Sequence, residues 1–361
     1  MKFLHRICAL AFLVISLLAF TGLVLSAHSL WIDPSKLSTL SLLSLTFPFW
    51  ALLVLVLSIL ALILRYWPSL IIGILGLCWA FPQIMSYIPL GNAASGSPSE
   101  ADTRQIGILS YNVGGFYKTD GAWDAITQYI MESDADVVLL QEYQKAGSIT
   151  RLTKAYPYHH SGATGQKGAG SHLAIFSKLP IISSKSMDLD SDFNGGWSYL
   201  LRMDDDTLWV ANCHLESNQL GKEDLNSFGK VISSKKVDTL RQYGPKLIQK
   251  LSRAARKRAP QARKVDSLMR GQLQSGHGVI VAGDFNDSPQ SYAHELLARS
   301  LKDAFRSGGH GPGFTYENSK LRFRTDHILF SKDMEVVDCQ VDASISASDH
   351  FPILSTLKKA D

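Results

Sequence analysis

The stretch VIVAGDFNDSP, residues 279–289, joins a run of apolar residues directly to an acidic and amide cluster of Asp284, Asn286 and Asp287. A buried strand that ends in polar groups is a common place for chemistry, because the rigid strand fixes side chains that the next loop leaves open to a ligand. Asp and Asn also form tight turns by hydrogen bonding to their own backbone. Taken alone, the stretch is either a site or a turn, and residues elsewhere in the chain must decide.

Further short apolar runs in the chain have the length of strands. Helical periodicity appears between them, in residues 122–132 and 291–299, and apolar residues recur every three to four positions between Asp224 and Leu273. This alternation predicts one mixed α/β domain in which helices cover sheets. The runs are IGILSYN (106–112), DVVLLQE (136–142), HLAIFS (172–177), LWVANCHL (208–215), GVIVAGD (278–284), DHILF (326–330) and HFPILSTL (350–357).

Most of these runs begin or end in a polar residue that a buried strand does not need for packing. One such residue would be unremarkable, but many at corresponding strand ends predict convergence on one cleft. The residues are Asn112, Glu142, His214, Glu216, Asp284, Asn286, Asp326, His327, Asp349 and His350.

The residue types indicate the chemistry. The oxygen donors of Asn112, Glu142 and Asp349 suit a hard divalent cation such as Mg²⁺ or Mn²⁺. Histidines beside carboxylates carry protons near neutral pH. A metal ion and cationic donors together serve phosphoryl transfer, in which they stabilise charge on the non-bridging oxygens.

The motifs, in this order, resemble the endonuclease/exonuclease/phosphatase (deoxyribonuclease I-like) superfamily over residues 106–358. They are ILSYNVGGF, VVLLQEY, SHLAIFSKLPI, ANCHLES, VAGDFNDSP, RTDHILF and SDHFPI. The resemblance implies a four-layer α/β/β/α sandwich with its cleft at one end. It also implies a metal site at Asn112, Glu142 and Asp349.

The same resemblance implies roles for the remaining candidates. Asp284 would orient or deprotonate the attacking water, and Asn286 would hold the phosphate or that water. His350, polarised by Asp326, would contact the scissile phosphate or act as the base. His214 would be a second phosphate contact or the acid for the leaving group. The resemblance leaves open which group takes the proton.

Each candidate also has a structural interpretation. Asn112 can end a strand in a turn, Glu142 can be a solvated strand end, and Asp326 can bond backbone at a strand start. His214 and His350 can be satisfied structural histidines. For His159, His160, His172 and His327 the structural or peripheral interpretation is favoured. Cys213 alternates with His214, so its side chain is expected on the opposite face, away from the site.

The first ninety residues have a different composition from the rest. The chain of 361 residues is 46% hydrophobic, with a mean hydropathy of +0.04, and almost no charge lies before residue 100. Ile7–Ser26, Leu40–Leu64 and Trp67–Leu90 are each long enough to cross a bilayer. We expect three transmembrane helices in residues 1–90. A cleaved signal peptide is the alternative for the first, but the two further spans favour a retained anchor.

Basic residues predict the orientation of this anchor. Lys2 and Arg6 precede the first span and Arg65 lies between the second and third, so the positive-inside rule places the N-terminus in the cytoplasm and the catalytic domain outside. Residues 91–105 have the small, polar composition of a linker, and residues 106–361 form the domain. A periplasmic or extracellular domain on a bacterial inner membrane is the expected location.

Charge bears on the substrate. Residues 222–270 contain fourteen Lys or Arg and four Asp or Glu, a net charge of +10, although the whole chain carries +4. This segment is either a solvated helix face or an attractor for nucleic acid, phosphorylated headgroups or an anionic membrane. The expected function is a membrane-anchored, metal-dependent phosphodiesterase acting on nucleic acid or on phospholipid or phosphoinositide headgroups. A noncatalytic phosphate-binding or scaffolding domain is the alternative, and no protein partner is expected.

Overall fold

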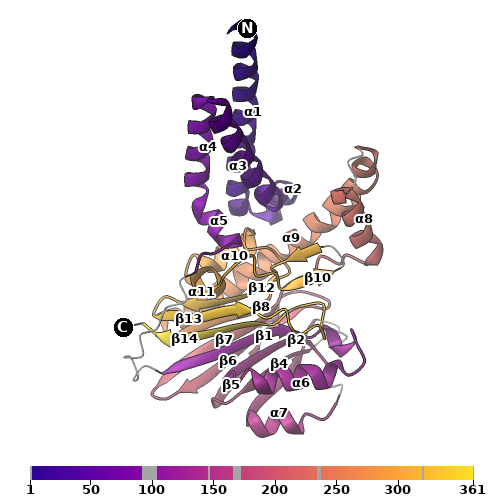
Figure 1. The fold of residues 1–361 in the computed structure, drawn as a ribbon. Coiled ribbons are helices and arrows are strands. Elements are labelled where there is room, and N and C mark those ends of the chain that lie inside the picture. Colours follow the sequence, from indigo (N-terminus) through magenta and orange to yellow (C-terminus); the bar gives the residue numbers. More distant parts are fainter. Residues whose placement is uncertain are drawn as a thin grey trace.

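The computed structural model describes residues 2–91, 104–144, 147–165, 172–233, 237–318 and 321–360. It has a helical N-terminal bundle that stands on an α/β domain, and an arm of two helices leaves the domain beside the bundle (Figure 1).

Two six-stranded sheets form the centre of the domain. The first has the order β13-β14-β1-β2-β4-β3 and the second the order β5-β6-β7-β8-β12-β9. The strands of the first are β13 (Met334–Val341), β14 (Ile353–Lys359), β1 (Gln105–Asn112), β2 (Val137–Tyr143), β4 (His172–Ser177) and β3 (Tyr158–Ala163). Those of the second are β5 (Ile181–Ser186), β6 (Gly195–Met203), β7 (Asp206–His214), β8 (Gly278–Asp284), β12 (Asp326–Ser331) and β9 (Leu301–Asp303).

Alternating side chains divide the core into layers. Ile108 of β1 and Leu139 of β2 meet Val210 of β7 and Ile280 of β8 between the two sheets. On the outer face of the first sheet pack α6 (Ala122–Glu132) and α7 (Thr150–Ala155). On the outer face of the second pack α9 (Val237–Gln274) and α10 (Tyr292–Ala298). The predicted four-layer α/β/β/α sandwich is therefore confirmed.

Two parallel pairs position the site. Strand β1 pairs parallel to β2, and β7 pairs parallel to β8, so the carboxyl ends of all four strands lie at one edge of the sandwich. The hairpin of β10 (Tyr316–Asn318) and β11 (Leu321–Phe323) borders this edge, because Tyr316 bridges to His350. Smaller elements are η3 (Gly114–Phe116) and α11 (Ala304–Gly308).

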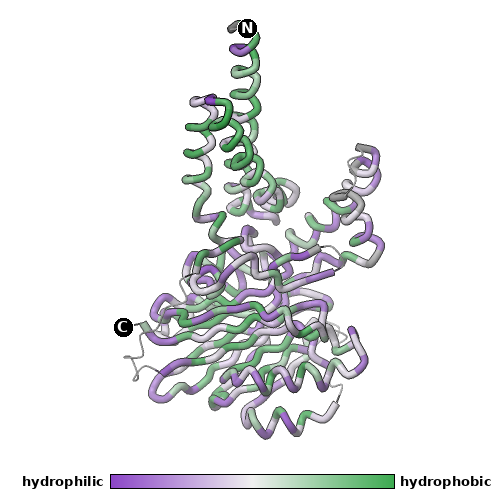
Figure 2. Tube along the Cα trace, viewed as in Figure 1, coloured by the Kyte–Doolittle hydropathy of each residue, from purple (hydrophilic) through white to green (hydrophobic). Residues whose placement is uncertain are grey.

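The N-terminal bundle contains helices long and apolar enough to cross a membrane. They begin with α1 (Lys2–His28), followed by η1 (Ser29–Trp31), α2 (Pro34–Ser41), η2 (Leu42–Thr46) and α3 (Phe47–Leu64). Among the described residues, Phe3–Trp31 and Pro34–Leu64 meet the criteria of length and hydropathy for a span. Figure 2 shows mostly hydrophobic colour along α1, α3 and α4 (Trp67–Trp79), whereas hydrophobic and hydrophilic colours are mixed in the domain.

The third expected span is not one straight helix. Helix α4 and α5 (Phe81–Tyr87) meet at a bend of 60°, so the bundle has two spans, or three if the bent pair crosses as one. Pro82 lies in the first turn of α5, where a proline is tolerated but interrupts the preceding helix. Close packing holds the bundle: a Cβ on Gly22 would lie 2.5 Å from the Trp50 ring.

The bundle also contacts the domain. Asp33, which caps α2, pairs with Arg263 of α9 at 2.9 Å, and Trp31 donates to Glu295 of α10 at 3.2 Å. The expected linker mostly lies outside the described residues. At its two ends, the Gly91 amide donates to the Gly309 carbonyl at 3.2 Å, and β1 begins at Gln105.

Candidate active site

Three predicted residues form one row at the edge of the second sheet. In the strand register His214 pairs with Asp284, and Asp284 pairs with Asp326. Each of the three residues is an even number of positions from the inward-facing apolar residues of its strand, so alternation points its side chain into the space between the sheets. Gly283 makes this row possible, because its φ is +132° and a Cβ there would lie 2.0 Å from the Cys213 carbonyl oxygen.

Glu142 reaches the site through an irregularity in β2. Leu140 and Tyr143 both pack on the outer face of the first sheet, so simple alternation would not place residues 141 and 142 together on the inner side. The pairing of β2 with β4 shifts between Leu140 and Tyr143, and Glu142 has a φ of +52°. This bulge turns the Glu142 carboxylate toward the cleft, where 41% of the side chain is exposed.

The side chains converge on one carboxylate oxygen. Asp284 Oδ2 lies 3.1 Å from Asn112 Nδ2, 3.6 Å from His214 Nε2 and 3.7 Å from His350 Nε2. Glu142 Oε1 is joined to the same group, at 3.3 Å from Asn112 Nδ2 and 3.7 Å from His214 Nε2. Residues from β1, β2, β7 and β8 thus meet His350, which lies shortly before β14, within a single cleft.

His350 is held by a buried carboxylate. Its Nδ1 lies 2.9 Å from Asp326 Oδ2, which directs Nε2 toward Asp284. Burial lowers the pKa of His350, but the carboxylates of Asp326 and Asp284 outweigh this effect and raise the pKa to about 10. Burial raises the pKa of Asp284, and Asp326 adds to the rise, whereas His350 and His214 oppose it.

Asp349 and Asn286 lie at the margins of this group. Ser348 Oγ donates to the Asn112 carbonyl at 2.7 Å, which fixes the turn carrying Asp349 beside the end of β1. Asn286 has a φ of +53°, and its Nδ2 donates to the Leu215 carbonyl at 3.0 Å, so the amide ties the loop after β8 to the loop after β7. Its backbone amide donates to Asp284 Oδ1 at 2.7 Å and fixes that carboxylate.

The donor set fits a divalent cation. The carboxylates of Glu142, Asp284 and Asp326 belong to this group, and Asp326 Oδ1 and His214 Nδ1 are buried without a hydrogen-bond partner among the described residues. Ligand atoms of Asp284, Asp326 and His350 all lie within 4.8 Å of one another, close enough to hold a metal ion. This trio differs from the expected ligands Asn112, Glu142 and Asp349. Asp326 and His350 of this trio already bond each other, whereas 41% of the Glu142 side chain is exposed.

A cavity of about 360 Å³ lies beside the group around Asp284. Glu142, His214, Phe193, Asn194, Ser217 and Gln219 line it. Phe193 is exposed over 54% of its surface, so the cavity has an apolar wall opposite the polar side chains of Glu142 and His214.

Sequence reasoning missed the polar layer beneath the site. Gln141 Nε2 donates to Ser110 Oγ at 3.2 Å and to Asn212 Oδ1 at 2.8 Å, and this buried network joins the two sheets directly under Asn112 and His214. Asn212 precedes His214 by two residues in a strand, so alternation alone could have identified it as facing the same layer.

Arg258 of α9 was also missed. Its side chain is buried and bonds Asp287 at 3.0 Å, the Glu216 carbonyl at 2.9 Å and Asn218 at 3.0 Å. It thereby joins the loops after β7 and β8. No signal in the sequence separates it from the other basic residues of that helix.

Other histidines lie away from the cleft. His327 alternates with Asp326 and faces the outer layer, where it lies beside His294 and Asp303 and bonds the Asp287 carbonyl at 3.0 Å. His159 stacks on Phe176, and His160 packs on Trp197. Glu216 turns away from the row and pairs with Lys257 at 2.9 Å.

Known proteins share both the motifs and the fold. The endonuclease/exonuclease/phosphatase family matches residues 109–350. The inositol phosphosphingolipids phospholipase C of Schizosaccharomyces pombe is 30% identical over 205 residues, which cover 54% of this chain and 44% of that protein. The chain therefore spans less than half the length of this relative.

Solved structures support the sandwich architecture. An endonuclease/exonuclease/phosphatase from Bacteroides vulgatus superimposes with a TM-score of 0.52 and 16% identity, covering 71% of this chain and 100% of that one. The human nocturnin catalytic domain with bound sulfate anion superimposes with a TM-score of 0.51 and 16% identity, covering 71% of this chain and 95% of that one. TDP2 from Caenorhabditis elegans superimposes with a TM-score of 0.51 and 16% identity, covering 71% of this chain and 75% of that one. At these identities the likeness shows the fold alone.

Proposed function

Because the chain belongs to the endonuclease/exonuclease/phosphatase family, we propose that it is a metal-dependent phosphodiesterase whose active site is the cleft around Asp284. The observation that carries the proposal is the meeting of Asn112, His214 and His350 within 3.7 Å of one Asp284 oxygen. A noncatalytic binding domain has no need of a buried carboxylate flanked by two imidazoles.

The geometry supports the following roles in the proposed reaction. A water attacks phosphorus, a new P–O bond forms and the bond to the leaving oxygen breaks. Asp284 accepts the proton of the water, and His214 donates a proton to the leaving oxygen. His350, oriented by Asp326, donates from Nε2 to a non-bridging oxygen, since its raised pKa suits a donor better than a base.

Glu142, Asn112 and Asp349 would hold the cofactor, Mg²⁺ or Mn²⁺. Bound there, the cation would neutralise charge on the phosphate. In the structure Asn112 places its amide between the Glu142 and Asp284 carboxylates and so sets their spacing. The tie from Asn286 to the Leu215 carbonyl keeps His214 and Asp284 in register.

Phospholipid headgroups are the substrate class we propose first. The apolar N-terminal helices would hold the cleft near a bilayer, and the relative from S. pombe is named for cleaving phosphosphingolipids. Tethering raises the local concentration of lipid substrates. Nucleic acid is the second candidate, and the basic segment of residues 222–270 favours it.

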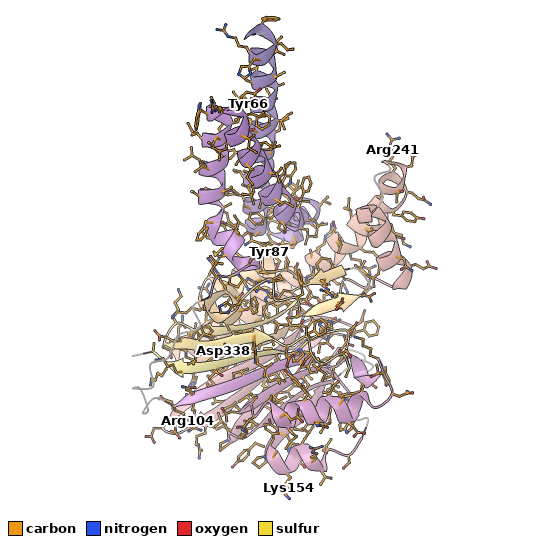
Figure 3. The ribbon with its side chains drawn as sticks, viewed as in Figure 1. Tyr66, Tyr87, Arg104, Lys154, Arg241 and Asp338 are labelled. Atoms are coloured by element: carbon orange, nitrogen blue, oxygen red, sulfur yellow. The ribbon has the colours of Figure 1, made fainter. Side chains whose placement is uncertain are left out.

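The anchor supports an orientation with the domain outside. Figure 1 shows the N-terminus at the end of α1 that is far from the domain, and Figure 3 shows Tyr66 at the same far end and Tyr87 next to the domain. Arg6 and Arg65 therefore lie at the end of the bundle away from the catalytic domain. By the positive-inside rule that end is cytoplasmic, which agrees with an inner-membrane protein with an external domain.

A substrate panel tests the proposal. The purified full chain is assayed on phospholipid vesicles, single-stranded DNA and a generic aryl phosphodiester, with Mg²⁺, Mn²⁺ or a chelator. We expect turnover that needs the cation, and a loss of about 10²–10⁴-fold in Asp284→Asn. Asp206→Asn is the matched control, because this exposed carboxylate begins β7 at the opposite end from the cleft. Metal-independent turnover, or full activity of Asp284→Asn, would refute the assignment.

A further inference from the structure

The arm of α8 (Lys222–Ser233) and the first half of α9 leaves the domain at the level of the anchor. Arg256 of α9 donates to Ser38 Oγ at 3.0 Å, and Arg263 pairs with Asp33 at 2.9 Å. Both partners lie between the first two apolar helices, where the bundle meets the domain. The middle of α9 is therefore placed where a bilayer surface would lie if the bundle spans a membrane.

From this point α9 rises beside the bundle instead of staying with the domain. Fifteen residues separate Arg256 from Arg241, which is about 22 Å of helix. Figure 3 shows Arg241 near the free end of the arm, at a level between Tyr66 and Tyr87, which mark the two ends of the bent pair α4 and α5. The outer half of the arm consequently reaches the level of the apolar helices, where a bilayer around them would surround its charged side chains with hydrocarbon, an environment in which such side chains are costly.

The composition of the arm suits a charged lipid surface. Residues 222–256 contain nine Lys or Arg and three Asp or Glu, a net charge of +6. Lys246 and Lys250 pair with Asp224 inside the arm, whereas Arg241 and Arg253 are exposed and pair with no carboxylate in the part of the chain that the structure describes. Ile248, on the same helix, exposes 47% of its surface.

We propose that in the membrane the arm bends away from this level and docks on the anionic headgroups of the bilayer that holds the N-terminal helices. The inference rests on the membrane anchor proposed above. Unpaired basic side chains contact anionic lipid, and apolar residues such as Ile248 enter the headgroup layer, as in an interfacial amphipathic helix. The root of the arm carries Lys257 and Arg258, which bond the Glu216 region beside the cleft, so docking would fix the cleft relative to the lipid surface.

Hydrogen exchange measured by mass spectrometry on the full chain in nanodiscs tests this. Discs of phosphatidylcholine are compared with discs that also contain phosphatidylglycerol. We expect slower exchange of residues 237–250 in the anionic discs, and loss of that difference at high salt. The double variant Arg241→Gln with Arg253→Gln should lower the docking equilibrium about 25-fold, since each basic residue near an anionic surface contributes about fivefold. Lys154→Gln is the matched control, because Figure 3 shows it at the far end of the domain.

The outcomes separate the arm from the anchor. A chain that fails to enter nanodiscs contradicts the anchor itself. A chain that enters discs but shows the same exchange in both lipids, or protection of 237–250 by single-stranded DNA instead of lipid, overturns the docking of the arm.

Discussion

The backbone of Glu142 has a φ of +52°, in the left-handed region that costs a residue with a Cβ roughly 1–2 kcal/mol. With ordinary strand angles this side chain would follow Leu140 toward the outer face and leave the cleft. Turning this carboxylate inward therefore lowers the free energy of unfolding by a small amount. Strained backbone conformations of this kind are concentrated at functional sites, where the surrounding structure holds them in place.

Gly283, one residue before Asp284, also has a positive φ that helps to position a side chain of the site. The Cys213 carbonyl lies where a Cβ would be, so parallel strands β7 and β8 approach closely enough to place His214 beside Asp284. Only glycine allows that approach together with the positive φ.

We predict that Gly283→Ala destabilises the chain by about 3 kcal/mol or more, through the clash and the strained φ. Thermal unfolding of the detergent-solubilised protein should show a fall in Tm of about 10 °C. Gly271→Ala is the matched control: this glycine is inside α9 with nothing within 4 Å of the added Cβ, so alanine should stabilise by up to about 1 kcal/mol. Equal Tm values for the two variants would contradict the prediction.

At the scale of elements, the outer layer of the second sheet depends on a buried polar cluster. His294 of α10 bonds Asp303 of β9 at 2.9 Å, and His327 of β12 packs against the His294 ring. Burial lowers the pKa of His327 well below 6.5, and the nearby His294 adds to this. Burial raises the pKa of Asp303, but the bond from His294 and the charge of Arg324 outweigh it, so the net pKa is lowered.

The sign of the pH effect follows from these directions. Below pH 6.5 the unfolded chain binds a proton at His327 that the folded chain does not, so stability is full above that pH and falls as the pH drops. We expect a loss of about 2 kcal/mol from His327 between pH 7 and pH 5, at about 1.4 kcal/mol per unit below 6.5.

Unfolding of the full chain in detergent at several pH values measures this loss. His327→Gln keeps a donor for the Asp287 carbonyl but has no titrating ring, so its stability should depend less on pH in this window. His172→Gln, at the exposed start of β4, should keep the wild-type slope. A wild-type slope in His327→Gln would show that other groups cause the acid loss.

At the scale of the whole molecule, the N-terminal bundle and the α/β domain are joined by contacts as well as by the chain. Asp33 and Trp31 contact α9 and α10, and Arg324 donates to the Ser86 carbonyl of α5. Most large hydrophobic side chains that are exposed lie before residue 91. Such a surface is stable in lipid, not in water.

We therefore expect the full chain to remain in the membrane fraction after washing with high salt and with alkaline carbonate, and to be released only by detergent. Helices buried in hydrocarbon resist both treatments, whereas electrostatic binding through basic residues does not. Immunoblotting of the supernatant and pellet measures the outcome. Release by salt alone would mean that the N-terminal helices do not span the bilayer.

The sequence by itself determined the sandwich and the apolar N-terminal region, because motif order and hydropathy are local properties of the chain. Asn112, His214, Asp284 and Asp326 could be placed at strand ends by period two alone. The apolar run 67–90 was expected to be one span, but composition does not reveal a bend.

Only the tertiary structure decided the contacts between distant segments. The bulge at Glu142, the layer of Gln141 and Asn212, and the buried Arg258 of α9 depend on which strands and helices become neighbours. The course of α9 past the N-terminal bundle also depends on which segments become neighbours. A charge pattern defines a polar helix face, but the packing of α2 on α9 decides where in space that face lies.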